Sequence, residues 1–211
     1  MTKNLINLLL SVAFLFYTAP LHAQNSVEAV DLGLSVKWAS CNVGASSPEE
    51  VGDYFAWGET KPKKKYTDLN YETCYNYILD LSKSNSDYLS RLEGVDDAAY
   101  MNLQRGWRMP TVDEVWELRH LCKWEPAELN GVKGMRITGL NGNSIFLPAG
   151  GRKATTILGI TNLEYPTTGF YWTANVCLQA QGSAYCLYFE DYPKTSFEPR
   201  WTASPVRAVC K

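Results

Sequence analysis

Histidine is nearly absent from this chain, and its scarcity excludes several kinds of site. The 211 residues contain two histidines, His22 and His120. His22 lies in a segment that we expect to be removed on export, so a metal site built on several histidines is excluded. Only His120 is left for a Ser-His or Cys-His catalytic arrangement. It falls on the polar side of a predicted helix with no acid or nucleophile beside it in sequence, so we predict a surface histidine.

Cys-x-x-Cys and an excess of basic residues are also missing. Without Cys-x-x-Cys, the chain has no zinc-ribbon or thioredoxin-like signature. The formal net charge is −2, and without a basic face nothing indicates a nucleic-acid partner. The one basic cluster, Lys61-Pro62-Lys63-Lys64-Lys65, is isolated and contains proline, so we predict a solvated loop there.

No apolar run is long enough to span a membrane as a helix. The longest candidate, residues 5–17, has about 13 residues where roughly 20 are needed. It follows Lys3 and precedes Ala23, which predicts a secretory signal peptide, residues 1–23, cleaved after Ala23. No cysteine stands at this junction, so no lipid attachment is expected. We expect a secreted, periplasmic or cell-surface protein without a transmembrane segment in its mature form, folded as a single domain, residues 24–211.

Local signals predict few helices. Thr111 as N-cap, with Glu114 three residues later, forms a capping box that starts a helix running to about Cys122. Asp96-Asp97 directly precedes Ala98-Ala99. Adjacent acids at this place are typical of a helix N-terminus, where they favour the helix dipole, rather than of a metal or acid pair.

Strands are more numerous. They are predicted at residues 36–39, 53–57, 135–138, 144–147, 170–177, 184–189 and 206–209. Asn141-Gly142 suits a type I′ turn in a hairpin. Segment 170–177 alternates with period two, with the core on the Trp172 side. Few helices and many antiparallel strands indicate an α+β fold.

Six cysteines follow the predicted signal peptide, and an even number in an exported chain favours disulfides. They are Cys41, Cys74, Cys122, Cys177, Cys186 and Cys210. If segments 170–177 and 184–189 pair as a hairpin, Cys177 and Cys186 point the same way at a separation that a disulfide can close. Cys186–Cys210 is the main alternative, and six cysteines allow about 15 pairings.

Residues 107–118 carry the most specific motif of the chain. They read Trp-Arg-Met-Pro-Thr-Val-Asp-Glu-Val-Trp-Glu-Leu, which resembles the Arg-Leu-Pro-Thr-x-x-Glu-Trp-Glu signature of formylglycine-generating-enzyme-like domains, a branch of the C-type lectin fold. The chain also resembles the Fibrobacter succinogenes major paralogous domain family of secreted Bacteroidetes proteins. This second resemblance spans almost all of residues 28–209, in order, at Val30–Ala39, Gly52–Thr60, Asn141–Ala149, Gly169–Thr173 and Ser204–Arg207.

The resemblance implies a C-type-lectin-like, formylglycine-generating-enzyme-like domain whose C-terminal loops present a recognition surface. It also implies a Cys41–Cys122 disulfide that ties the early strands to the capped helix. The copper-binding cysteine motif of those enzymes cannot be placed on Cys177, Cys186 or Cys210. The calcium motifs of the sugar-binding lectins, Glu-Pro-Asn, Gln-Pro-Asp and Trp-Asn-Asp, are missing. We therefore expect no catalytic residue, no cofactor and no metal.

The expected function is that of a non-catalytic recognition module that binds a glycan or a protein outside the cytoplasm. The alternatives are a structural or accessory subunit of a surface assembly such as a fimbria and, with weaker support, a cysteine- and copper-dependent oxidase. Five tryptophans in patterned elements are predicted in the core: Trp38, Trp57, Trp107, Trp116 and Trp172. Connections between strands tolerate recognition residues best. We therefore expect ligand contacts in segments 175–181 and 192–201, through Asn175, Gln179, Gln181, Tyr192, Phe197, Arg200 and Trp201.

Overall fold

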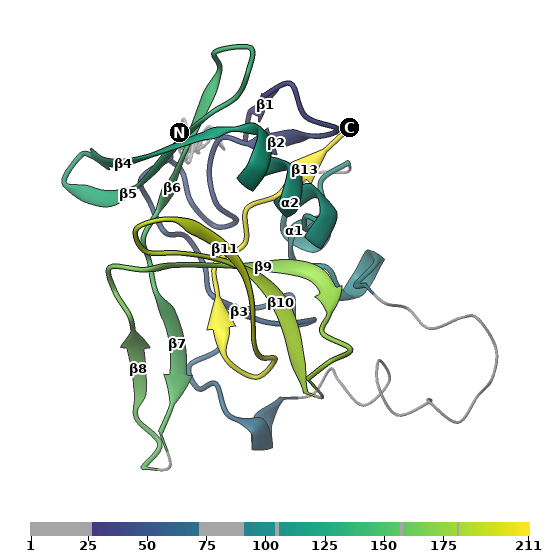
Figure 1. The fold of residues 1–211 in the computed structure, drawn as a ribbon. Helices are drawn as coiled ribbons and strands as arrows, with labels where there is room; N and C mark the ends of the chain where they lie inside the picture. Colours follow the sequence, from purple (N-terminus) through teal and green to yellow (C-terminus); the bar gives the residue numbers. More distant parts are fainter. Residues whose placement is uncertain (1–26, 72–90, 104–105, 157, 181) are drawn as a thin grey trace, which may run out of the picture.

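The computed structural model describes residues 27–71, 91–103, 106–156, 158–180 and 182–211, mainly as antiparallel strands with few helices (Figure 1). This confirms the predicted α+β class. The strands are β1 (Ala29–Val30), β2 (Lys37–Ala39), β3 (Phe55–Ala56), β4 (Lys123–Leu129), β5 (Val132–Thr138), β6 (Ser144–Pro148), β7 (Arg152–Thr155), β8 (Thr161–Glu164), β9 (Gly169–Val176), β10 (Ser183–Phe189), β11 (Pro193–Pro199), β12 (Ala203–Ser204) and β13 (Val209–Cys210). The helices are the 3-10 turns η1 (Asp68–Asn70) and η2 (Gly94–Asp96) and the α-helices α1 (Ala98–Asn102) and α2 (Val112–Leu121). The predicted signal peptide, Cys74 and Gln181 lie outside the described residues.

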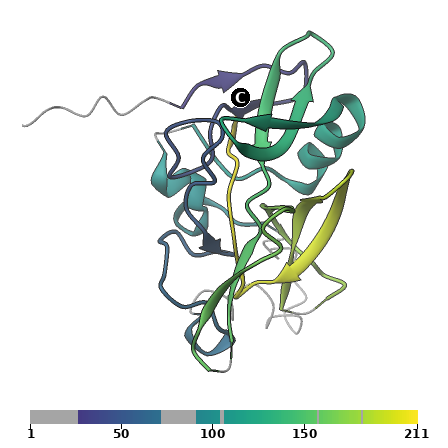
Figure 2. The ribbon, with the colours of Figure 1, turned by 90° about the vertical axis from the view of Figure 1, so that its left-hand side faces the viewer.

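The described strands form four small sheets, with the strand orders β1-β2-β13, β4-β5-β6, β11-β10-β9 and β3-β12-β7-β8. The first sheet joins the two ends of the described chain, because β1 and β13 both pair with β2. The β1-β2-β13 and β4-β5-β6 sheets occupy one end of the molecule and the β7–β8 hairpin the other (Figure 1, Figure 2). Within the described residues, no helix is long and apolar enough to cross a membrane.

Strand β9 separates two hydrophobic cores. Its even-numbered residues from Phe170 to Val176 pack in the first core, as the alternation predicted. Tyr171, on the other face, is also buried and packs in the second core with Val115 and Leu118 of α2. The prediction of a core on the Trp172 side alone was therefore incomplete. Helix α2 contacts β9, β10 and β11, so it buries the second face of this sheet as well.

Helix α2 begins with the predicted capping box. Thr111 Oγ1 accepts a hydrogen bond from the Glu114 N–H at 3.3 Å, and the Glu114 carboxylate accepts one from the Thr111 N–H at 2.8 Å. Arg108 donates to the same carboxylate at 2.8 Å. Burial alone would raise the pKa of Glu114, but the hydrogen bonds from Arg108 and Thr111 outweigh it and hold this pKa below its usual value. The helix ends at Leu121, with Cys122 as C-cap, as predicted.

Asp97 caps helix α1, which confirms the interpretation of the Asp96-Asp97 pair. Its carboxylate accepts hydrogen bonds from the N–H groups of Ala99 at 2.8 Å and Tyr100 at 3.0 Å. A third bond comes from the Met109 N–H at 2.8 Å. This third bond ties the start of α1 to the segment that leads into α2.

Of the five tryptophans predicted in the core, four are buried or partly buried: Trp38, Trp57, Trp107 and Trp172. The prediction for Trp116 was wrong, because its side chain is 52% exposed. It stacks on His120, one turn further along α2, with ring centroids 4.4 Å apart. Both rings lie on the solvent side of the helix, and His120 is exposed, as predicted.

The described cysteines, Cys41, Cys122, Cys177, Cys186 and Cys210, are free thiols. The predicted Cys177–Cys186 and Cys41–Cys122 disulfides and the alternative Cys186–Cys210 are thus not formed in this structure. For the first pair, the register gives the reason. Cys186 lies opposite Trp172 and packs in the first core, whereas Cys177 follows Val176 and lies on the opposite face of the sheet.

The hairpin around Asn141-Gly142 is confirmed, but its turn type is not. Thr138 pairs with Ser144, so the connection contains residues 139–143 rather than two residues. Of the Asn-Gly pair, only Gly142 has a positive φ, 87°, whereas a type I′ turn needs positive φ at both positions. Two other predicted strands are shorter than expected: 53–57 reduces to β3, and 206–209 to β13.

Arg207, which belongs to the last stretch of the family resemblance, is a structural residue. It is 1% exposed, and burial lowers its pKa to about 10. Its guanidinium donates to Asn42 Oδ1 at 2.7 Å and to the carbonyls of Ala39, Ser40 and Phe146 at 2.8 to 2.9 Å. The side chain therefore fastens the end of the chain to the segments after β2 and within β6.

Candidate functional site

Two of the predicted ligand-contact residues serve the scaffold instead. Asn175 Oδ1 accepts a hydrogen bond from the Val112 N–H at 2.8 Å, at the first residue of α2. Arg200 is 1% exposed. Its guanidinium lies over the Trp57 ring, 4.8 Å from the centroid, and donates to the Ser183 carbonyl at 3.1 Å. The prediction that Arg200 offers a donor fork to a ligand was wrong, because this group is used inside the fold.

Segment 192–201 is mostly a strand, β11, rather than the predicted loop. Within it, Tyr192 is 60% exposed, Phe197 is 50% exposed and Trp201 is half-buried. Gln179, in the connection between β9 and β10, is exposed. Phe197 lies on the same face of β11 as Thr195, whose hydroxyl accepts a hydrogen bond from Arg119 of α2. The predicted residues therefore do not converge on one site.

A groove of about 390 Å³ lies between β11 and the β7–β8 hairpin. We call it the aromatic groove; it is lined by Arg152, Tyr165, Phe170, Tyr188, Lys194, Thr195, Ser196 and Glu198. Three of these residues are neighbours across the sheet, because Tyr188 of β10 pairs with Phe170 of β9 and with Lys194 of β11. The groove thus continues the face of the sheet that forms the first core.

Three aromatic rings form one side of the aromatic groove. Phe170 and Tyr188 meet edge to face with centroids 5.2 Å apart, and Tyr165 lies 5.8 Å from Phe170. Tyr165 is 56% exposed. Its φ of 53° is in the left-handed region, which is uncommon for an aromatic residue and is found more often at functional sites than elsewhere. The rings offer an apolar surface that is partly open to solvent.

An ion pair between Arg152 of β7 and Glu198 of β11 forms the other side and links two sheets. The Arg152 guanidinium also lies 5.3 Å from the Tyr165 centroid and 5.4 Å from the Phe170 centroid. Both charged side chains are 16% exposed. A planar guanidinium and a carboxylate therefore lie next to the aromatic rings, and both are largely shielded from solvent.

Lys194 brings a cation to the rim of the aromatic groove. Its Nζ lies 4.3 Å from the Tyr192 centroid and 5.6 Å from the Tyr188 centroid. A hydrogen bond with the Tyr192 side chain raises the pKa of Lys194. Desolvation and then a hydrogen bond to Glu190, at 3.1 Å, raise the pKa of Tyr188. At neutral pH the groove therefore presents the ammonium group of Lys194 and the uncharged phenol of Tyr188.

Sequence reasoning named none of the residues that line the aromatic groove as ligand contacts. Segment 192–201, where ligand contacts were predicted, contributes Lys194, Thr195, Ser196 and Glu198 to its lining. Arg152, Tyr165 and Tyr188 were missed, because each comes from a different segment. The one local signal was Tyr165 in the turn sequence Tyr165-Pro166 after a polar stretch.

The thiols whose pKa is shifted are poor nucleophiles at neutral pH. Burial raises the pKa of Cys186 to about 12 and also raises that of Cys122, whereas reactive cysteines have a lowered pKa. In the described part of the chain, no group of three or more His, Cys, Asp or Glu side chains is placed to hold a metal ion. A scan against models of protein families, a search of curated proteins and a search of solved structures each find no match to this chain.

Proposed function

We propose that this protein is a non-catalytic recognition module, exported from the cytoplasm, that binds a saccharide through the aromatic groove. We further propose a C-type-lectin-like domain, on the strength of the motif at residues 107–118 and the stretches that resemble the Fibrobacter succinogenes major paralogous domain family. The many antiparallel strands and few helices support that proposal.

One observation supports the choice of ligand. Aromatic rings that are partly exposed and charged side chains line the same groove. Small-molecule sites combine apolar and aromatic walls with a few fixed polar groups that orient the ligand. A sugar ring has apolar C–H faces that can stack on Tyr165 or Tyr188. Its hydroxyls can donate to Glu198 and accept from Arg152 and Lys194, as charge-assisted hydrogen bonds.

The charges favour an uncharged saccharide over an anionic one. Arg152 is already paired with Glu198, so it does not supply a free positive charge. The acidic residues Glu190 and Asp191, exposed in the turn next to the groove, offset the ammonium of Lys194. An anionic ligand would find no net positive field here.

A glycan array probed with the exported protein tests the proposal, followed by calorimetric titration of the strongest oligosaccharide. The double variant Tyr165→Asn and Lys194→Ala should weaken binding roughly tenfold or more, since it removes a ring and a charged donor from the site. Asparagine suits position 165 because it tolerates a positive φ. Both side chains are exposed, so the melting temperature should stay within a few degrees.

The matched control is Phe197→Ala with Lys133→Ala. It also removes an exposed ring and an exposed lysine, but from the opposite face of β11 and from β5. This control should bind as wild type does. Failure of every oligosaccharide to bind, or equal binding by the groove variant, would refute the proposal, and a protein ligand on another surface would then be the better explanation.

A further inference from the structure

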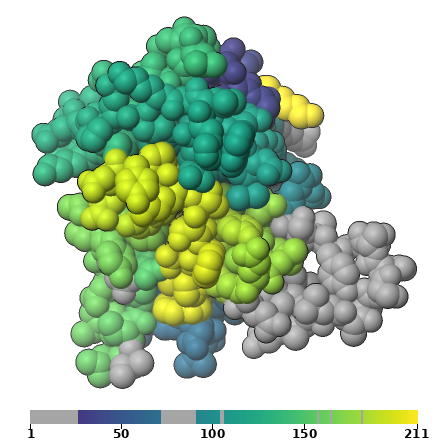
Figure 3. Space-filling model, in the orientation of Figure 1, coloured from purple at the N-terminus to yellow at the C-terminus, as the bar shows by residue number. Residues whose placement is uncertain are grey.

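A second surface, which we call the tip surface, lies at the end of the molecule farthest from the β4-β5-β6 sheet. It consists of Lys61, Lys64, Lys65, Leu69, Leu158 and Ile160. These residues belong to the segment before and within η1 and to the turn between β7 and β8. Both segments protrude at the lower edge of the molecule, and the space-filling view shows them as convex projections (Figure 1, Figure 3).

The aliphatic side chains of the tip surface are strongly exposed. Leu69 is 94% exposed, Leu158 81% and Ile160 57%. Turns normally carry Gly, Pro, Asn, Asp or Ser, so large aliphatic residues at such positions need a reason. Leu158 and Ile160 flank Gly159, whose φ of 75° makes the tight turn, so the turn itself does not require them.

Hydrogen bonds hold the two segments side by side. Thr161 Oγ1 donates to the Lys64 carbonyl at 2.8 Å. The Tyr66 N–H donates to Thr155 Oγ1 at 2.7 Å, and the Thr155 N–H donates to the Tyr66 carbonyl at 2.9 Å. The lysines and the aliphatic residues therefore share one surface although they are far apart in the sequence.

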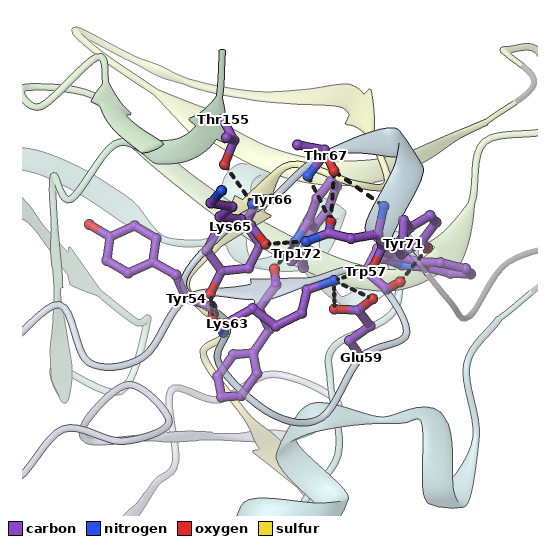
Figure 4. Close-up of polar contacts among 12 residues, drawn as sticks. Tyr54, Trp57, Glu59, Lys63, Lys65, Tyr66, Thr67, Tyr71, Thr155 and Trp172 are labelled. Atoms are coloured by element: carbon purple, nitrogen blue, oxygen red, sulfur yellow. Dashed lines mark hydrogen bonds and ion pairs between the residues drawn. The ribbon is translucent and has the colours of Figure 1, made fainter. Parts of the chain in front are cut away.

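The lysine segment is also fixed internally, as Figure 4 shows. Thr67 and Asn70 form a capping box around η1, and Asn70 Nδ2 donates to the Lys65 carbonyl at 2.9 Å. Lys63 forms an ion pair with Glu59 at 2.7 Å. Lys61, Lys64 and Lys65 are exposed instead, as predicted for a solvated loop. From Lys61 to Asn70 the only acidic residue is Asp68, so the exposed charge is positive.

We propose that the tip surface docks on a lipid membrane that contains anionic lipids. Leu69, Leu158 and Ile160 would enter the headgroup boundary, and the exposed lysines would contact the anionic headgroups. The positive charge complements that membrane, and a membrane takes up convex aliphatic projections without needing a matching cavity. A protein partner would need a concave, well-packed complement to the same residues. This proposal does not depend on saccharide binding at the aromatic groove.

Vesicle co-sedimentation with the exported protein tests the proposal, with pure phosphatidylcholine compared against phosphatidylcholine that contains phosphatidylglycerol. We expect binding to the anionic vesicles, weakened by added salt. Lys64→Gln with Lys65→Gln should lower this binding roughly tenfold or more, because each juxtamembrane lysine contributes to the attraction. Leu158→Ser with Ile160→Ser should lower it by roughly tenfold as well, through lost apolar burial.

Two control variants change the same residue types at the other end of the molecule. Lys37→Gln with Lys133→Gln removes two exposed lysines, and Leu140→Ser removes a leucine that is 84% exposed in the β5–β6 turn. Both controls should bind vesicles as wild type does. The proposal is overturned if no anionic vesicle is bound, if pure phosphatidylcholine is bound equally well, or if the tip variants bind as strongly as their controls.

Discussion

Asp97 allows the sharpest test of how the helical part of this fold is held together. Its side chain is 2% exposed and accepts hydrogen bonds from the N–H groups of Ala99, Tyr100 and Met109. Asp97→Ala removes the N-cap, which costs about 1 kcal/mol of stability. It also leaves the Met109 N–H without its acceptor in a buried place, at about 1–3 kcal/mol. We therefore expect Asp97→Ala to lower the free energy of unfolding by about 2–4 kcal/mol.

Asp97→Asn separates these two contributions. Asparagine caps a helix about as well as aspartate, so the bonds from Ala99 and Tyr100 can persist. Its amide nitrogen would face the Met109 N–H, donor against donor, so only the second contribution is lost. We expect a loss of about 1–3 kcal/mol, smaller than that of the alanine variant. Asp113→Asn, at an exposed acid in the first turn of α2, is the matched control and should change stability by less than about 0.5 kcal/mol.

Urea unfolding followed by tryptophan fluorescence measures these differences, and a thermal melt checks them. For a domain of this size each kcal/mol shifts the melting temperature by roughly 2–4 °C, so Asp97→Ala should melt roughly 5–15 °C lower. Equal losses for the alanine and asparagine variants would show that the N-cap bonds to Ala99 and Tyr100 do not contribute separately from the Met109 bond. A loss below about 0.5 kcal/mol for Asp97→Ala would refute the reasoning altogether.

Four further predictions concern other parts of the chain. Intact-mass measurement of the exported protein should find a chain that begins at Gln24, and a mass that still includes Met1 would contradict the signal peptide. Arg200→Ala should lower stability by about 2–4 kcal/mol in urea unfolding, because it removes a buried group packed on Trp57; unchanged stability would mean that Arg200 is not packed there. In the native protein Cys186 should react with a thiol reagent only on unfolding, since its pKa is about 12 and it is buried, whereas fast labelling would place it at the surface. The pKa of Glu114 is lowered in the fold, so the stability that this carboxylate contributes is present above the usual carboxyl pKa and is lost as the pH falls through the folded value. Glu114→Gln should therefore flatten this part of the acid-unfolding curve. An unchanged curve would mean that other groups cause the loss of stability in acid.

The aromatic groove illustrates what sequence reasoning could reach. Segment 192–201 could be singled out because it collects polar and aromatic residues near the end of the chain. Its strand character was missed, however, and with it the alternation that turns Lys194, Ser196 and Glu198 to one face and Phe197 to the other. Arg152 and Tyr165 could not be assigned to the site at all, because they reach it through the pairing of β7 with β8 and β12.

The cysteines and Arg200 show the same limit of prediction from sequence. An even number of cysteines suggested disulfides, but the faces on which Cys177 and Cys186 lie depend on the register between β9 and β10, which contains an irregularity between Ala184 and Cys186. Arg200 looked like a recognition residue because arginine next to tryptophan often is one. Its burial follows from the position of Trp57, a residue far away in the sequence.

Features that depend on neighbours a few residues apart could be predicted from the local sequence. The capping box at Thr111, the cap at Asp97, the hairpin around Gly142 and the alternation in β9 each satisfy backbone groups or sort side chains within one short segment. The tertiary fold sets which strands are buried on both faces, which charges are paired and which surfaces stay open. Those outcomes are set by packing and hydrogen bonds between segments distant in the chain, and no local pattern encodes how such segments meet.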